Sequence, residues 1–110
     1  MVFSVASPLL DSCVLALIDQ GDTYGYALTQ GIRECLEISE STLYPILRRL
    51  QQQGALQTYD KPFQGRNRRY YTITPVGKVM LNAYRREWQS YRQKIEGLLF
   101  DGEGEKKDEQ

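Results

Sequence analysis

Two short segments hold most of the side chains that could bind a polyanion. The first, Ser41–Leu50, places its polar and cationic side chains opposite its leucines when it is wound as a helix. The second, Gly65–Thr74, begins with a cluster of arginines and continues as a β-like run. Guanidinium and hydroxyl groups donate hydrogen bonds to phosphate oxygens and base edges. A helix followed by a basic hairpin is typical of a winged helix-turn-helix, so the expected ligand is duplex DNA.

Side chains suited to catalysis are scarce. The 110 residues include no histidine, which removes the commonest general base and the commonest metal ligand. The two cysteines, Cys13 and Cys35, follow no metal-ligand spacing, and each falls in a helical pattern where a buried reduced thiol is the simpler interpretation. A thiol redox sensor stays open as an alternative. We therefore expect a protein without enzymatic activity, metal or cofactor.

Charge is segregated along the chain although the net charge is zero. Residues 1–40 carry one base and six acids, a balance of −5. Residues 41–71 carry six bases and the single acid Asp60, a balance of +5. This distribution favours one polyanion-binding surface, although a solvated basic face would have the same composition.

Three helices are expected before the hairpin. Ser7, followed by proline, is typical of a helix start, and apolar spacing continues to Gln20. A second helix is expected from near Thr23. Ser39 is a favourable N-cap for a third helix, which Gly54 ends. The core face of this third helix is predicted to consist of Leu43, Ile46, Leu47 and Leu50.

Two β-like runs, 55–59 and 69–73, are expected to pair around a loop of residues 60–68. A narrow minor groove attracts arginine, so the loop tip is predicted to enter that groove or to hold the DNA backbone. The side chains concerned are Gln64, Arg66, Asn67 and Arg68. A last helix is expected from Pro75 to about Phe100, with Thr74 as its N-cap.

A heptad stripe runs along this last helix, formed by Leu81, Tyr84, Trp88, Tyr91, Ile95 and Leu98. A small winged domain offers nothing of its own to cover such a stripe, so we expect a second copy of the chain to do so. The sequence thus predicts a mostly α fold with a small β-hairpin. Residues 1–74 form the winged domain, 75–100 the dimerisation helix, and 101–110 a disordered tail without apolar residues.

Membrane segments are not expected. No apolar run approaches the roughly 18 residues that a bilayer span needs. The first residues lack the cationic and apolar regions of a signal peptide, so a cytoplasmic location is predicted.

Three stretches of the sequence resemble the PadR-type transcriptional regulators: Gly21–Tyr26, Ser41–Leu56 and Arg68–Gly77. Leu-Tyr-Pro and Arg-Tyr-Tyr in this order are specific, and the resemblance extends over residues 8–100. It implies a winged helix-turn-helix homodimer that represses transcription, often of stress-response or multidrug-transporter genes. Two protomers would place their third helices about one duplex turn apart, on a pseudo-palindromic operator. The C-terminal helix, packed with the first helix, would form the dimer interface, and the short chain resembles the small subfamily. With the resemblance, the predicted DNA-binding set is Tyr24, Ser39, Ser41, Thr42, Tyr44, Pro45, Arg48, Arg49, Lys61, Gln64, Arg66, Asn67 and Arg68.

The same resemblance implies a role for Trp88. In drug-responsive members of the small subfamily, a tryptophan at the matching place lines a pore at the dimer centre and stacks on flat aromatic compounds. The corresponding pocket here would comprise Leu10, Val14, Tyr84, Trp88, Tyr91 and Arg92. Arg92 departs from the acidic residue that would suit cationic drugs, which leaves neutral or anionic aromatics. Trp88 could equally be a large apolar residue in the dimer seam.

The alternative function is a winged-helix module that binds proteins and not DNA. A basic hairpin tip argues against it, because the core of a protein interface is depleted of charge.

Overall fold

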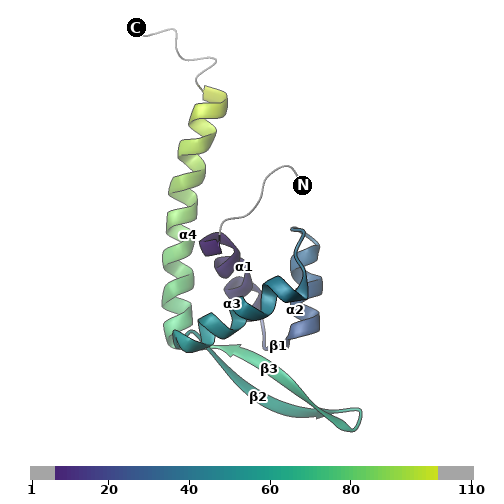
Figure 1. Cartoon of the computed structure of the whole chain (residues 1–110). Helices are drawn as coiled ribbons and strands as arrows, with labels where there is room; N and C mark the ends of the chain where they lie inside the picture. Colours follow the sequence, from purple (N-terminus) through teal and green to yellow (C-terminus); the bar gives the residue numbers. More distant parts are fainter. Residues whose placement is uncertain (1–6, 102–110) are drawn as a thin grey trace, which may run out of the picture.

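Three helices and a three-stranded antiparallel sheet form a winged domain, from which a long fourth helix projects (Figure 1). The computed structural model describes residues 7–101. The elements are α1 (Ser7–Asp19), β1 (Thr23–Tyr24), α2 (Gly25–Arg33), α3 (Glu40–Gln52), β2 (Leu56–Phe63), β3 (Arg66–Ile73), α4 (Pro75–Glu96) and a π-helical turn, η1 (Gly97–Asp101). The predicted fold class, mostly helical with a small β part, is confirmed.

The core lies where α1, α2 and α3 meet. Apolar side chains at helical spacing on each of the three helices are buried there, among them Val14, Leu15, Leu28, Ile32 and Leu47. The predicted core face of α3 is confirmed, since all four of its apolar residues are buried. Because one face of α3 packs in this core, the opposite face of the helix is exposed to solvent.

The ends of α3 are set by local chemistry. The hydroxyl of Ser39 accepts a hydrogen bond from the backbone N–H of Thr42 at 3.3 Å, as the N-cap prediction required. Gly54, at φ 80°, follows the last turn and reverses the chain toward β2. The predicted bounds of the third helix are therefore confirmed.

The sheet has the order β1-β3-β2, with both pairs antiparallel. Gln64 and Gly65 alone turn the hairpin, both with positive φ, as a tight two-residue turn requires. The predicted loop of residues 60–68 is wrong, because β2 and β3 pair as far as Phe63 and Arg66. The second helix was expected from near Thr23, and α2 begins two residues later, at Gly25, because Thr23 and Tyr24 form β1.

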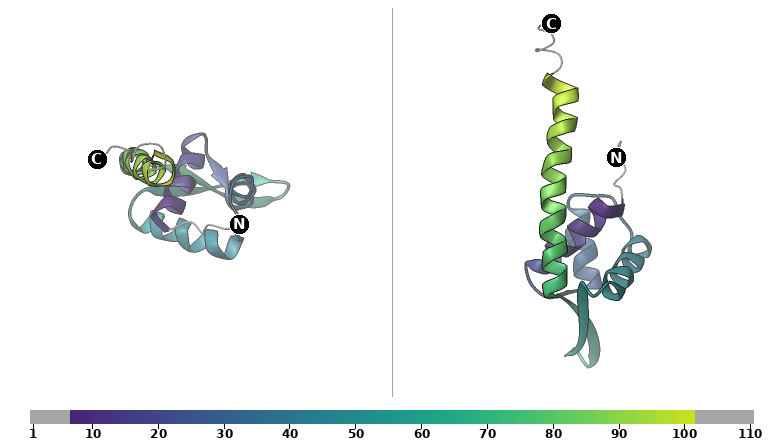
Figure 2. Two further views of the ribbon diagram at one scale, coloured as in Figure 1. Left: turned by 90° about the horizontal axis from the view of Figure 1, so that it is seen from above. Right: turned by 90° about the vertical axis from the view of Figure 1, so that its left-hand side faces the viewer.

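The long helix α4 is fixed to the winged domain at its base. Thr74 caps it by accepting a hydrogen bond from the N–H of Gly77 at 3.0 Å, and the Thr74 hydroxyl donates to the Gly54 carbonyl at 2.6 Å. The first turns of α4 pack on α1, with Leu81 buried. The rest of α4 and the hairpin extend in opposite directions from the helical domain (Figure 2).

Asp101 belongs to η1, so it does not start the predicted tail, and residues 102–110 lie outside the described part of the chain. Within residues 7–101, no helix combines the length and apolar content that crossing a membrane requires.

Candidate nucleic-acid interface

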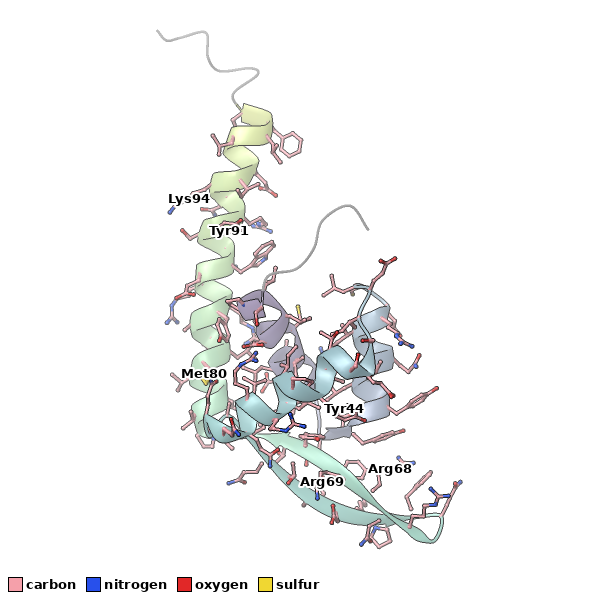
Figure 3. All side chains as sticks on the ribbon, in the orientation of Figure 1. Tyr44, Arg68, Arg69, Met80, Tyr91 and Lys94 are labelled. Carbon is pink, nitrogen blue, oxygen red and sulfur yellow. The ribbon has the colours of Figure 1, made fainter. Side chains whose placement is uncertain are left out.

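A groove of about 720 Å³ opens between α3, the start of α2 and the hairpin. Five of the predicted DNA-binding residues line it: Tyr24, Tyr44, Arg48, Asn67 and Arg68. Figure 3 shows Tyr44, Arg68 and Arg69 around the space between α3 and the hairpin. The helix and the hairpin that the sequence singled out separately therefore face one another across a single groove.

The groove is cationic. Among the described residues that line it, Arg48, Arg68 and Arg69 carry positive charge and Asp60 carries negative charge. Arg69 and Asp60 are paired across the hairpin, with Nε and Oδ1 3.6 Å apart. Both side chains are largely exposed, so this ion pair contributes little and leaves the Arg69 guanidinium accessible to a phosphate.

Arg68 is held between two aromatic rings. Its guanidinium carbon lies 3.8 Å from the ring centroid of Tyr24 and 3.4 Å from that of Phe63. Its Nη1 also donates to the Tyr70 hydroxyl at 3.4 Å. Arginine stacks well on aromatic faces because its guanidinium is planar and weakly hydrated. The stack therefore ties the hairpin to β1, directly before α2.

A polar stripe follows the outer face of α3 toward its N-terminus. Exposed side chains recur there at helical spacing: Ser41, Thr42, Tyr44, Pro45 and Arg48. The hydroxyl of Ser39 shares hydrogen bonds with those of Ser41 and Thr42, at 2.8 and 3.2 Å. Free backbone N–H groups at a helix N-terminus favour anions, so this end of the stripe suits a phosphate.

The hairpin tip carries the other predicted contacts. Lys61, Arg66 and Asn67 lie on the exposed ends of β2 and β3, and Gln64 lies in the turn. Phe63, Gln64, Arg66, Asn67 and Arg68 surround a second hollow of about 530 Å³. Lys61 faces the ring of Tyr70, with Nζ 5.7 Å from its centroid, on the same face of the hairpin as Arg68.

A different groove, of about 410 Å³, lies between α1 and α4. Its lining is mainly apolar and consists of Leu9, Ser12, Cys13, Ala16, Leu36, Leu81, Tyr84, Arg85 and Trp88. Burial raises the pKa of the Cys13 thiol, and the nearby Cys35 raises it further, against a lowering hydrogen bond from Ser12. Cys13 is therefore a neutral, apolar part of this wall at neutral pH.

The heptad stripe of α4 is covered only at its base. Leu81 is buried in the chain's own core and Tyr84 is half-buried. On α4, Trp88 is 41% exposed and Tyr91 60%; Leu98, in the π-helical turn η1 that follows, is 79% exposed. Figure 3 shows Tyr91 on the part of α4 that extends beyond α1.

Comparison with known proteins accounts for this combination of groove, wing and projecting helix. The family model described as the transcriptional regulator PadR-like family matches residues 14–83. The chain belongs to this family. The predicted family is thus confirmed, and its members are transcriptional regulators and not enzymes.

Several relatives and solved structures cover most of the chain. The crystal structure of a Streptococcus mutans protein, smu.1704, is 39% identical and has a TM-score of 0.84, with 90% of this chain and 93% of that one aligned. The Mycobacterium tuberculosis transcriptional regulator Rv3488 is 35% identical over 77 residues, which cover 69% of this chain and 72% of Rv3488. Bacillus subtilis PadR, solved in complex with operator DNA, shares the fold at 24% identity and a TM-score of 0.63, over 68% of this chain and 45% of PadR.

One residue that the sequence predicts to contact DNA forms an ion pair within this PadR-like chain. The sequence predicts a DNA contact for Arg49, but its Nη2 donates to Oδ1 of Asp11 on α1 at 2.5 Å. Residue 49 lies between the exposed and buried faces of α3, so its long side chain can reach α1. Arg49 therefore has a structural partner, and it does not line the groove between α3 and the hairpin.

The groove between α1 and α4 contains only some of the residues predicted for the aromatic pocket. Tyr84 and Trp88 do line the groove between α1 and α4, but Leu10 and Val14 are buried in the core. The face of α1 that lines the groove is the one bearing Leu9, Ser12, Cys13 and Ala16. Tyr91 and Arg92 lie farther along α4 and do not contribute to the lining.

Sequence reasoning missed six residues that line the groove between α3 and the hairpin: Gly25, Tyr26, Gln51, Asp60, Arg69 and Tyr71. The strand alternation could have found Arg69 and Tyr71, because they share one face of β3 with Asn67. Gln51 lies three residues after Arg48 on α3, which places both on neighbouring turns of one face.

Proposed function

We propose that this PadR-like chain is a homodimeric repressor that binds duplex DNA through the groove between α3 and the hairpin. The observation that carries the proposal is the meeting of Arg48, Arg68 and Arg69 beside the polar outer face of α3. Membership of a family of transcriptional regulators supports it. So does the fold shared with a PadR protein that was solved bound to its operator.

In this proposal α3 lies in the major groove. Ser41, Thr42, Tyr44, Pro45 and Arg48 would then face base edges and the flanking phosphates, with Ser39 and Tyr24 beside the backbone. The hairpin tip would reach the adjacent minor groove with Lys61, Gln64, Arg66, Asn67 and Arg68. Phosphate contacts set the register of the helix, and contacts with base edges give sequence preference.

A second copy of the chain would cover the exposed part of the α4 stripe. Tyr91, Ile95 and Leu98 offer the a/d spacing that a helix pair needs, and none of them is buried in the single chain. A symmetric dimer places two α3 helices about one helical turn of DNA apart, and therefore reads a pseudo-palindromic operator.

A flat aromatic effector is the proposed signal. The groove between α1 and α4 has room for one at about 410 Å³, and Trp88 and Tyr84 supply rings for stacking. Among its described lining residues, the charged one is Arg85, which favours a neutral or anionic compound. By analogy with the family, the regulated genes would serve stress responses or multidrug transport, in the cytoplasm.

The test of DNA binding is a footprint on the DNA upstream of the protein's own gene, with mobility shifts at several salt concentrations. We expect two protected half-sites and an affinity that falls steeply with salt, because phosphate contacts release counterions. Failure to retard any DNA would contradict the proposal and favour a winged-helix module that binds proteins.

A further inference from the structure

Asp11 lies at the centre of the packing between α1, α3 and α4. Its side chain is 8% exposed, and it accepts the 2.5 Å hydrogen bond from Arg49 of α3. The Arg49 side chain is 39% exposed, so the pair is buried at its acidic end and solvated at its basic end. A carboxylate buried in this way is stable only while its charged partner stays in place.

Tyr84 of α4 packs against the core cluster that contains Leu10 and Val14 of α1, the helix that carries Asp11. Burial raises the pKa of its hydroxyl, Asp11 raises it further, and Arg49 opposes the increase. Tyr84 also lines the groove between α1 and α4. Asp11 therefore stands between the wall of that groove and the helix that faces the DNA groove.

The ion pairs between α1 and α4 are weaker than the Asp11–Arg49 pair, because their basic side chains are exposed. Asp19, at the end of α1, faces Lys78 and Arg85 of α4 at 3.8 and 3.9 Å, and these basic side chains are exposed. Exposed pairs at this distance hold geometry weakly. Among the ion pairs of the described residues, the one that joins α3 to α1 is Asp11–Arg49.

We propose that the Asp11–Arg49 pair fixes α3 on α1 and couples the groove between α1 and α4 to the DNA-binding surface. Arg49 is then a positioning residue and not a DNA contact. A compound that moves Tyr84 shifts α1, on whose core residues Tyr84 packs, and α3 follows through the Asp11–Arg49 pair. The inference rests on the proposed function, since it presupposes that α3 binds DNA.

Coupling between two sites is reciprocal. If the groove changes DNA affinity, then DNA must change the groove, and Trp88 reports on it as the chain's single tryptophan. Trp88 lines the groove on α4, whereas the DNA surface is formed by α3 and the hairpin. A change in its emission on DNA binding is therefore a signal from a distant site.

The experiment compares the full-length wild type, Asp11→Asn and the control Asp19→Asn. The probe is a labelled duplex from the footprinted upstream region, followed by anisotropy and by Trp88 emission. We expect the wild type and Asp19→Asn to show the same Trp88 change at saturation. Asp11→Asn should bind on the order of tenfold more weakly, with an unchanged salt slope and no Trp88 change at saturation.

A double variant, Asp11→Asn with Arg49→Gln, removes both charges and leaves no buried charge unpaired, so it stays informative if Asp11→Asn unfolds. It too should lose the Trp88 response. The inference is overturned if the double variant keeps the wild-type change in Trp88 emission. It is also overturned if Arg49→Gln lowers the slope of log K against log salt by the amount expected for one lost phosphate contact. DNA binding by the wild type without any Trp88 change overturns the coupling alone. No DNA binding by the wild type overturns the proposed function and the inference with it.

Discussion

The ring of Tyr44 on α3 lies directly against Gly25, the first residue of α2. A Cβ atom at position 25 would lie 2.6 Å from the Tyr44 hydroxyl oxygen and 3.1 Å from two ring carbons. The absence of a side chain at residue 25 therefore sets where Tyr44 rests in the groove between α3 and the hairpin. Because the atoms in the way belong to the end of a side chain, an added methyl group moves the ring and leaves the backbone in place.

Gly25→Ala should therefore weaken DNA binding with little effect on folding. We expect a loss of about tenfold in affinity, or about 1.4 kcal/mol, and a change of less than about 1 kcal/mol in the free energy of unfolding. Anisotropy and urea denaturation measure the two quantities. Adding Tyr44→Phe to Gly25→Ala removes the closest atom, so the double variant should bind better than the sum of the single losses predicts.

Arg48→Ala and Arg66→Ala test the two sides of the interface. Each should weaken binding without unfolding the protein, because both side chains are exposed. If each holds one phosphate, the slope of log K against log salt falls by about 0.9 for each variant. Lys94→Ala, on the far part of α4 (Figure 3), is the matched control and should bind as the wild type does. Unchanged mobility shifts for both arginine variants at several salt concentrations would rule out this surface.

Gly77→Ala should destabilise the joint between the hairpin and α4. A Cβ there would lie 2.3 Å from the Ala55 carbonyl oxygen, a backbone atom that cannot rotate away. Overpacking of this kind costs about 1–3 kcal/mol. Gly31→Ala is the control, because its Cβ would lie 3.4 Å from a Leu17 methyl carbon and alanine favours the helix. Thermal unfolding should show Gly77→Ala below the wild type and Gly31→Ala at or above it.

Ile95→Asp should dissociate the proposed dimer. A carboxylate in the apolar stripe of α4 would be buried unpaired against the second copy. Gln93→Asp places the same charge on the opposite side of the helix and should leave the assembly intact. Sedimentation velocity at several concentrations distinguishes the two, and a wild type that stays monomeric would refute the dimer itself.

A ligand in the groove between α1 and α4 should quench Trp88 and shield Cys13, since both line it. The raised pKa of Cys13 means that less thiolate is present at neutral pH than for an ordinary thiol, so its alkylation should be slow and should accelerate as pH rises. A panel of planar aromatics can be screened by fluorescence, with mass spectrometry of iodoacetamide labelling as the second readout. A compound that quenches Trp88 fluorescence without protecting Cys13 from labelling would bind Trp88 outside this groove.

The helical part of the fold could be predicted because its causes are local. Ser39 and Gly54 mark the ends of α3 by capping chemistry, and the spacing of its leucines marks the buried face. The hairpin was predicted, but its outer half was taken for a loop because both faces of that half meet solvent, as Asp60, Lys61 and Arg66 show by their exposure. A strand without a buried face has no hydrophobic alternation to reveal it.

By itself, the sequence determined the helices, the polar face of α3, the arginines of the hairpin and the family to which the chain belongs. Only the tertiary structure decided which side chains meet. Thr23 and Tyr24 become a strand because Tyr71 and Tyr70 lie beside them, and Arg49 turns inward because Asp11 lies within reach. Val14 does not line the groove between α1 and α4, because α1 is oriented so that this side chain is buried in the core. The periodicity of apolar residues predicts the secondary structure of a segment. Contacts between residues far apart in the sequence depend on how the helices and strands pack together.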